Sequence, residues 1–157
     1  MTSEARQAPP SDAGARSVTM QRVAPNKFTV TNARGGQITT GAGADIDFTP
    51  GELLLAAIGA CTGVDLDILV SRRAEPLSLQ IQVDGTKIRD ELGSRLTDLV
   101  VTYDAQFPEG AEGDEARAMV PKIVARSREK LCTVGRTVET GTPIRDVIRD
   151  QADASNR

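Results

Sequence analysis

The 157 residues are enough for one domain with its own hydrophobic core, so folding requires neither a disulfide framework nor a structural metal. The net charge of -3 argues against non-specific nucleic-acid binding, which needs a basic surface. Histidine is absent, which excludes Ser-His-Asp and Cys-His catalysis, HExxH zinc sites and histidine-ligated haem.

The N-terminal residues 1–16 are polar and rich in Pro, Ala and Gly, and they predict a disordered tail. No run of apolar residues is long enough to predict a membrane span, and the N-terminus lacks the pattern of an export signal. We therefore expect a cytoplasmic protein. In that compartment its two cysteines, Cys61 and Cys132, are either small buried side chains or redox residues.

Three short strand-like segments follow at 17–23, 27–31 and 36–40. Turn-forming residues separate them, at Asn26 and over 32–36. This succession of short strands and tight turns predicts an antiparallel meander.

A long apolar helix is predicted to begin at Thr49. Thr49 can cap it, Pro50 suits the first helical position, and Glu52 favours the positive helix start. The body, over 52–72, is apolar on nearly all sides from Leu53 to Ala60, which predicts a helix buried all round. One chain of this size has little material to enclose such a helix, so we expect a second subunit to help cover it.

Apolar residues alternate over 77–83 and 99–107, which predicts two half-buried strands joined by a turn at 90–93. A second amphipathic helix is expected over 114–131, with Pro121 imposing a kink or a later start. A short helix or turn should follow Cys132 and end at Gly141, and residues 144–148 predict a last strand. Strands and helices do not alternate regularly, so the fold class is α+β.

The two cysteines are the residues most able to carry chemistry. Cys61 has small neighbours, Gly59, Ala60 and Gly63, which would leave room for a substrate or a second sulfur. Cys132 comes just after a predicted helix end. Two cysteines are the minimum for a cycle with a peroxidatic and a resolving thiol, although free cysteines are also among the most buried residue types.

A nucleophilic thiolate needs a positive neighbour. The candidates are Arg34 in the Gly-rich turn, Arg22 in a strand and Arg136 beyond Cys132, each of which is equally compatible with a solvated surface charge. Asp65 lies four residues after Cys61 on the same helical face. An ionised Asp65 would raise the thiol pKa, so we expect it to pair with an arginine.

Two segments resemble the motifs of the OsmC/Ohr family. FTPGELLLAAIGACTGVDLDIL, at 48–69, resembles the central helix, with its Pro-x-Glu-Leu start and Ala-Cys end. LCTVGRTVETGTPI, at 131–144, resembles the second cysteine motif. The resemblance extends over 17–149, leaving 150–157 as a C-terminal tail, and it is nearest to the OsmC-like branch.

The resemblance implies antiparallel sheets around two long central helices in an intertwined homodimer. It also implies reduction of organic hydroperoxides, in which Cys61 attacks the peroxide and Cys132 resolves the sulfenic acid. The reductant would be a dithiol or lipoyl-bearing protein. No metal or organic cofactor is implied, and neither a nucleic acid nor a membrane is implied as a partner. Two alternatives are an OsmC-like dimer that binds an apolar ligand without catalysis, and a redox sensor.

One position departs from the family pattern. In well-studied peroxidases of the family a Glu directly follows the Pro and pairs with an Arg near the thiolate, whereas here that position is Gly51 and the acid is Glu52. Glu52 is nine residues before Cys61, which places it on the opposite side of a straight helix. We name Arg34 and Glu52 with the two cysteines as candidate catalytic residues, and expect Glu52 to reach the site only if the helix breaks.

Overall fold

The computed structural model describes residues 14–148, which form two compact units divided within one long helix. The first unit extends to Leu54 and the second begins at Leu55. Most of the predicted N-terminal tail and all of the predicted C-terminal tail, at 150–157, lie outside the described residues.

The first unit is a three-stranded antiparallel sheet of β1 (Val18–Ala24), β2 (Lys27–Asn32) and β3 (Gln37–Thr40), in the order β1-β2-β3. The predicted meander is confirmed. Asn26 adopts the left-handed conformation in the first turn, with φ of 58°. In the second turn the Asn32 side-chain oxygen accepts the backbone N–H groups of Arg34 and Gly36, which fixes the reversal locally.

The sheet has little apolar burial of its own. Met20 lies opposite Val30, and Val30 opposite Ile38, yet Met20 and Ile38 are 53% and 48% exposed. Among residues 14–54 the buried positions are Thr40 and Gly41. The backbone ladder therefore holds this unit together more than a hydrophobic core does.

Helix α1 (Pro50–Val70) begins where the sequence predicted. Thr49 and Glu52 form a capping box: the Thr49 backbone N–H donates to the Glu52 carboxylate at 2.7 Å, and the Glu52 N–H donates to the Thr49 hydroxyl at 3.3 Å. One side of the helix is buried, through Ile58, Gly59, Thr62, Gly63, Leu66 and Val70.

One chain by itself does not bury α1 on all sides, because Val64 and Ile68 are 59% and 52% exposed, so burial all round stays a prediction that depends on a second subunit. By length and composition α1 could also cross a membrane. The core helix of a soluble protein passes the same test, and this helix carries Asp65 and Asp67 among its residues.

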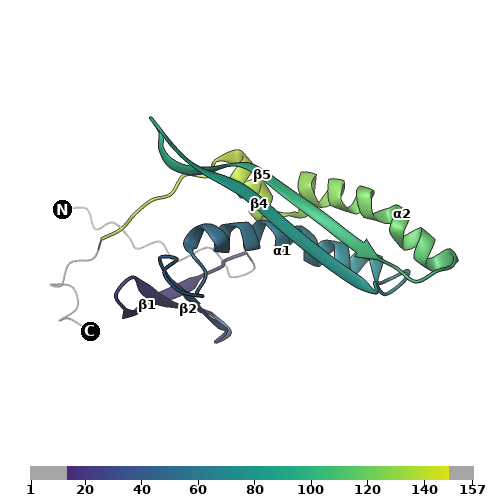
Figure 1. Cartoon of the computed structure of the whole chain (residues 1–157), viewed down its shortest axis with the longest axis horizontal. Coiled ribbons are helices and arrows are strands. Elements are labelled where there is room, and N and C mark those ends of the chain that lie inside the picture. The colour runs from purple at the N-terminus through teal and green to yellow at the C-terminus, as the bar shows by residue number, and fades with distance from the viewer. Residues whose placement is uncertain (1–13, 149–157) are drawn as a thin grey trace, which may run out of the picture. The chain divides into compact units, whose positions relative to one another are not determined.

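Strands β4 (Ser78–Asp90) and β5 (Gly93–Gln106) form a long antiparallel hairpin that lies along α1 in Figure 1. The contact is made possible by two glycines of the helix. A Cβ atom at Gly59 would lie 2.6 Å from the Val83 side chain, and one at Gly63 would collide with Ile81. The prediction that small residues leave room beside Cys61 is therefore wrong at these glycines, because β4 side chains fill that space.

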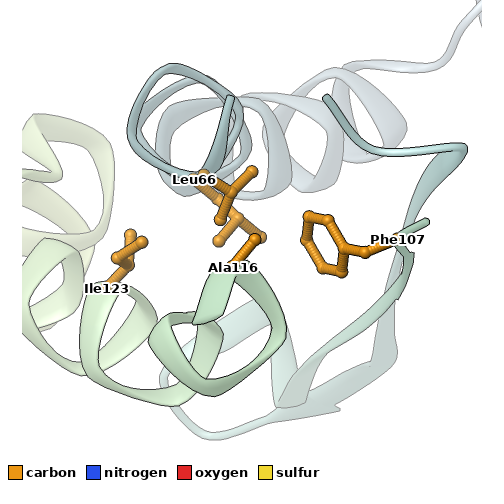
Figure 2. Packing of buried hydrophobic residues seen from close by; sticks show 5 residues of the cluster. Leu66, Phe107, Ala116 and Ile123 are labelled. Atoms are coloured by element: carbon orange, nitrogen blue, oxygen red, sulfur yellow. The ribbon is translucent and has the colours of Figure 1, made fainter. Parts of the chain in front are cut away.

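Helix α2 (Ala111–Arg126) completes the core of the second unit. Figure 2 shows Leu66 of α1, Phe107 at the end of β5, and Ala116 and Ile123 of α2 directed toward one another. The helix begins at Ala111 rather than near Asp114 and contains Pro121 in its interior, so the later start considered for it is wrong. Burial of Ala116 and Ile123 stabilises the helix on both sides of the proline.

A π-helical turn at Ser127–Leu131 joins α2 to Cys132, and its backbone bond runs from the Cys132 N–H to the Ser127 carbonyl at 2.8 Å. The wider turn breaks the predicted apolar stripe: Ser127 is buried, but Leu131 is 46% exposed. Helix α3 (Thr133–Thr140) follows and ends at left-handed Gly141, as predicted.

The last predicted strand, over 144–148, is wrong. The described residues after Gly141 form no strand, and Ile144 and Ile148 are 91% and 93% exposed. A segment forms a strand only where a neighbouring backbone supplies the ladder of hydrogen bonds, and these residues have no such neighbour in the described chain.

Candidate functional site

Both cysteines lie at the start of α3. Cys132 caps this helix, and its sulfur accepts the backbone N–H of Gly135 at 3.2 Å. Cys61, from the middle of α1, faces the backbone N–H groups of Thr133 and Val134. Both are free thiols in this structure. Two sulfurs from distant parts of the chain thus share the positive end of one short helix, where backbone donors favour negative charge.

The thiol of Cys61 is the less acidic of the two. Burial raises its pKa, as does its hydrogen bond with the Cys132 sulfur, and the N–H groups of Val134 and Thr133 oppose this only in part. Cys61 therefore holds its proton more tightly than Cys132 does.

Cys132 is the more acidic thiol even though it is 1% exposed. Burial alone would raise its pKa, but the net pKa is lowered by donors and charge: the Cys61 thiol, the Gly135 N–H, the Thr62 hydroxyl and the Arg128 guanidinium. The sequence did not predict this order, because it arises from contacts between α1, the π-helical turn and α3.

Arg128 was not among the predicted site residues. Its guanidinium lies 3.4 Å from the carboxylate of Glu139 on α3 and close to Gly135, over the first turn of that helix. The sequence had indicated only a positive charge near a helix end. The sequence feature that could have identified Arg128 is its position four residues before Cys132, about one helical turn away.

A pocket of about 140 Å³ lies beside this cluster. Its walls are mainly apolar, and Arg128 and Glu139 supply the charged groups; the other lining residues are Ile58, Leu99, Val101, Gly135 and Val138. Neither cysteine lines it. The pocket has the size and character for a small apolar group with a polar end.

Arg34 and Glu52 belong to the first unit, whereas both cysteines belong to the second. The side chain of Arg34 extends from the exposed β2–β3 turn, and Arg22 lies on β1. Arg136, on α3, lies 3.8 Å from Glu139. A pairing of Arg34 with the Cys61 thiolate therefore stays a prediction.

Glu52 has a structural role at the start of α1. The backbone N–H of Thr49 and then its hydroxyl donate to the carboxylate and lower the pKa of Glu52. Helix α1 continues without a break from Pro50 to Val70, so the interruption that would turn Glu52 toward Cys61 does not occur.

Asp65 does not pair with an arginine among the described residues, contrary to the prediction. It accepts a hydrogen bond from the Ser127 hydroxyl at 2.6 Å. Within residues 14–148 no group of three acidic or cysteine side chains is arranged to bind a metal ion.

Comparisons with known proteins agree on one family. The family model for OsmC-like proteins matches residues 41–145. An uncharacterized protein of Mycobacterium tuberculosis is 31% identical over 128 residues, covering 80% of this chain and 90% of the relative.

Two solved structures show the same fold. One is an OsmC-like protein of unknown function from Vibrio cholerae, with a TM-score of 0.64, 16% identity, and coverage of 80% of this chain and 94% of that one. The other is the organic hydroperoxide resistance protein OhrB of Bacillus subtilis, with a TM-score of 0.50, 16% identity, and coverage of 79% and 90%. The α+β class with antiparallel sheets is thereby confirmed.

Proposed function

Because this chain belongs to the OsmC-like protein family, we propose that it is a thiol-dependent peroxidase that reduces organic hydroperoxides through Cys61 and Cys132. The observation that carries the proposal is the meeting of the two sulfurs at the N-terminus of α3. A peroxidatic cycle needs two thiols within reach of each other and donors for the anion that forms.

In the first step the Cys61 thiolate attacks one oxygen of the peroxide. The O–O bond breaks, the departing alkoxide takes up a proton and leaves as an alcohol, and Cys61 becomes a sulfenic acid. The Cys132 thiolate then attacks the Cys61 sulfur, the S–O bond breaks, and hydroxide leaves as water after taking up a proton. A dithiol or lipoyl-type reductant returns two electrons to the disulfide.

The acidities of the two thiols support the second step directly. The lowered pKa of Cys132 increases the fraction of thiolate available to attack the sulfenic acid. The raised pKa of Cys61 means that the first step requires further positive charge. Two arginines are candidates for supplying this charge to the Cys61 thiolate. They are Arg34, which the sequence analysis paired with Cys61, and Arg128, which lies beside the Cys132 sulfur.

We further propose that the protein works as a homodimer in the cytoplasm. Exposed apolar residues on the first sheet and on α1, among them Met20, Ile38, Val64 and Ile68, are the surfaces that a second copy would cover. Light scattering that gave the monomer mass of 16.7 kDa at micromolar concentration would contradict the dimer.

A peroxidase assay with an alkyl hydroperoxide and with hydrogen peroxide, in the presence of a dithiol, tests the function. Wild-type protein should consume many equivalents, and the alkyl hydroperoxide faster. Cys61→Ser should consume none. Cys132→Ser should consume one equivalent and accumulate a trappable sulfenic acid at Cys61. If Cys61→Ser retains the first turnover and Cys132→Ser loses it, the two roles are reversed.

Arg34→Ala and Arg128→Ala distinguish the two positive charges. Loss of the one that stabilises the Cys61 thiolate should slow its alkylation at neutral pH, with recovery at alkaline pH where the thiolate forms in either protein. Arg136→Ala completes the series, because Arg136 was also a predicted candidate and, like Arg128, is paired with Glu139.

The small apolar pocket favours a second candidate, a non-catalytic dimer that binds an apolar ligand. Ile58, Leu99 and Val101 would contact the apolar part, and Arg128 an anionic end. Ligand recovered from purified protein, together with at most one equivalent of peroxide consumed, would favour this candidate. Sustained turnover without bound ligand would exclude it.

A further inference from the structure

A hydrogen bond between distant segments joins the two elements that carry the cysteines. The Ser127 hydroxyl, in the π-helical turn, donates to the Asp65 carboxylate of α1 at 2.6 Å. Ser127 is 0% exposed, so its hydroxyl depends on this acceptor rather than on solvent. The Thr62 hydroxyl is a second and longer contact of Ser127, at 3.4 Å. The bond to Asp65 is therefore the main polar connection between α1 and the π-helical turn.

Ser127 also holds Cys132 through its backbone. The Cys132 N–H donates to the Ser127 carbonyl at 2.8 Å, across five residues instead of the four of an α-helix. In an α-helix Leu131 would make this bond, so the wider turn places Cys132 there instead. Cys132 is 1% exposed, whereas Leu131 is 46% exposed. One residue thus binds α1 with its side chain and the second cysteine with its backbone.

On the other side of the bond, helix α1 ties Asp65 to Cys61. The two residues are four positions apart in a helix without a break, so they lie about one turn apart on the same face. The helix itself packs closely against β4, because Gly63 leaves no space for a Cβ atom beside Ile81. Helix α1 is therefore the packed support to which Ser127 fastens the π-helical turn.

We propose that Asp65 and Ser127 are positioning residues, whose hydrogen bond fastens the π-helical turn to α1 and thereby holds Cys132 in place to form a disulfide with Cys61. A π-helical turn is rare and occurs frequently at functional sites. Disulfide formation accepts only a narrow range of sulfur and Cβ positions, so a turn that is free to shift would disfavour it. The place of this bond in a catalytic cycle rests on the proposed function.

The test is the equilibrium between the reduced protein and its Cys61–Cys132 disulfide in mixtures of reduced and oxidised glutathione. For each protein disulfide formed, one oxidised glutathione takes two electrons and two protons and becomes two thiols. Acid quenching, followed by alkylation in denaturant, counts the free thiols even though Cys132 is buried in the folded protein. No peroxide is present, so the result does not depend on peroxidase turnover.

Two variants that remove the bond should lower the equilibrium constant for the disulfide. Ser127→Ala removes the donor without changing any charge and should lower the constant about tenfold. That factor corresponds to about 1.4 kcal/mol, the scale of one hydrogen bond to a charged group. Asp65→Ala should have a similar effect, because Ser127 then keeps only the longer contact with Thr62. The double variant should lose little more than either single one, because both changes remove the same bond.

Three further variants separate the bond from charge and from stability. Asp65→Asn removes the charge, as Asp65→Ala does, but keeps an oxygen that accepts from Ser127, so most of the wild-type constant should return. Asp67→Ala is the matched control, since Asp67 is an exposed acid on the same helix. Ile123→Val destabilises the core without touching the bond. The last two should leave the constant unchanged.

A purely structural bond would give a different result. Ser127→Ala would then lower the free energy of unfolding, as Ile123→Val does, with an unchanged disulfide constant, and this would overturn the proposal. Equal falls in Asp65→Asn and Asp65→Ala would assign the effect to charge and also overturn it. Asp65 is only partly buried, so these two variants decide even if Ser127→Ala fails to fold. Absence of peroxide turnover in the wild-type protein, with these shifts intact, would refute the proposed function and leave the positioning role standing.

Discussion

The two units of the chain differ in what stabilises them. In the second unit, α1, the hairpin and α2 enclose Leu66, Val70, Phe107, Ala116 and Ile123. In the first, a three-stranded sheet leaves its apolar side chains partly exposed, and its close side-chain contacts are polar, such as those of Lys27 with Asp45 at 2.6 Å and Asp47 at 2.5 Å. Exposed ion pairs of this kind contribute little stability.

This difference indicates what each unit does. The second unit provides a packed environment for the cysteine pair, since Cys61 lies on α1, which supplies Leu66 and Val70 to the core, and Cys132 is itself buried. The first unit has apolar surface without a core, and such a sheet requires a covering surface to be stable. A second subunit would provide that covering, and the following changes test this comparison.

The largest effect is expected at Leu66, and Ile38→Ala tests whether a second subunit covers the first sheet. Leu66 is 0% exposed in the core, so its truncation should reduce the free energy of unfolding by about 2–5 kcal/mol. Ile38 is 48% exposed, and in an isolated chain its truncation should cost only about 0.5 kcal/mol. Urea denaturation measures both. In the proposed homodimer a partner buries Ile38, so similar losses and a midpoint that depends on protein concentration are expected; a small loss at Ile38 that is independent of concentration would contradict this burial.

A smaller but sharper effect is expected where α1 meets β4. Gly63→Ala introduces a methyl group that collides with the terminal carbon of Ile81, which should cost about 1–3 kcal/mol of unfolding free energy. Ile81→Val removes that carbon, so the double variant should be more stable than Gly63→Ala alone. If the losses of unfolding free energy in the two single variants simply add in the double variant, the helix does not approach the hairpin at Gly63.

The smallest effect is expected at the capping box of the first unit. Thr49→Ala removes the hydroxyl that caps α1 and should cost about 1 kcal/mol in thermal or urea unfolding. The pKa of Glu52 is lowered by donation from the Thr49 backbone N–H and hydroxyl. Its contribution is therefore complete above the ordinary glutamate pKa and is lost as pH falls through the lowered pKa.

Glu52→Gln is the matched control for this pH dependence. It should lower the free energy of unfolding at neutral pH. At acid pH it should have no effect, because protonated Glu52 is then uncharged, as glutamine is. Alkylation of Cys61 should be unchanged in this variant. A strong loss of Cys61 reactivity would instead give Glu52 the role of the family's catalytic acid.

Much of the fold could be predicted because it depends on local patterns. Alternating apolar residues defined the hairpin, and Thr49, Pro50 and Glu52 marked the start of α1 through hydrogen bonds that span only a few residues. One failed prediction was the strand at 144–148, because no neighbouring strand pairs with this segment in the described chain. The small residues around Cys61 were misinterpreted for a related reason, since their spacing does not reveal what packs against them.

The sequence by itself determined most of the elements, the family and the two cysteines as candidate nucleophiles. Only the tertiary structure decided that both sulfurs meet at one helix start, that Cys132 is the more acidic thiol, and that Asp65 binds Ser127 rather than an arginine. The physical reason is that the pKa of a buried group depends on donors and charges that surround it in space. Those groups come from segments more than sixty positions apart, as the contact of Ser127 with Asp65 shows, and no local pattern encodes that distance.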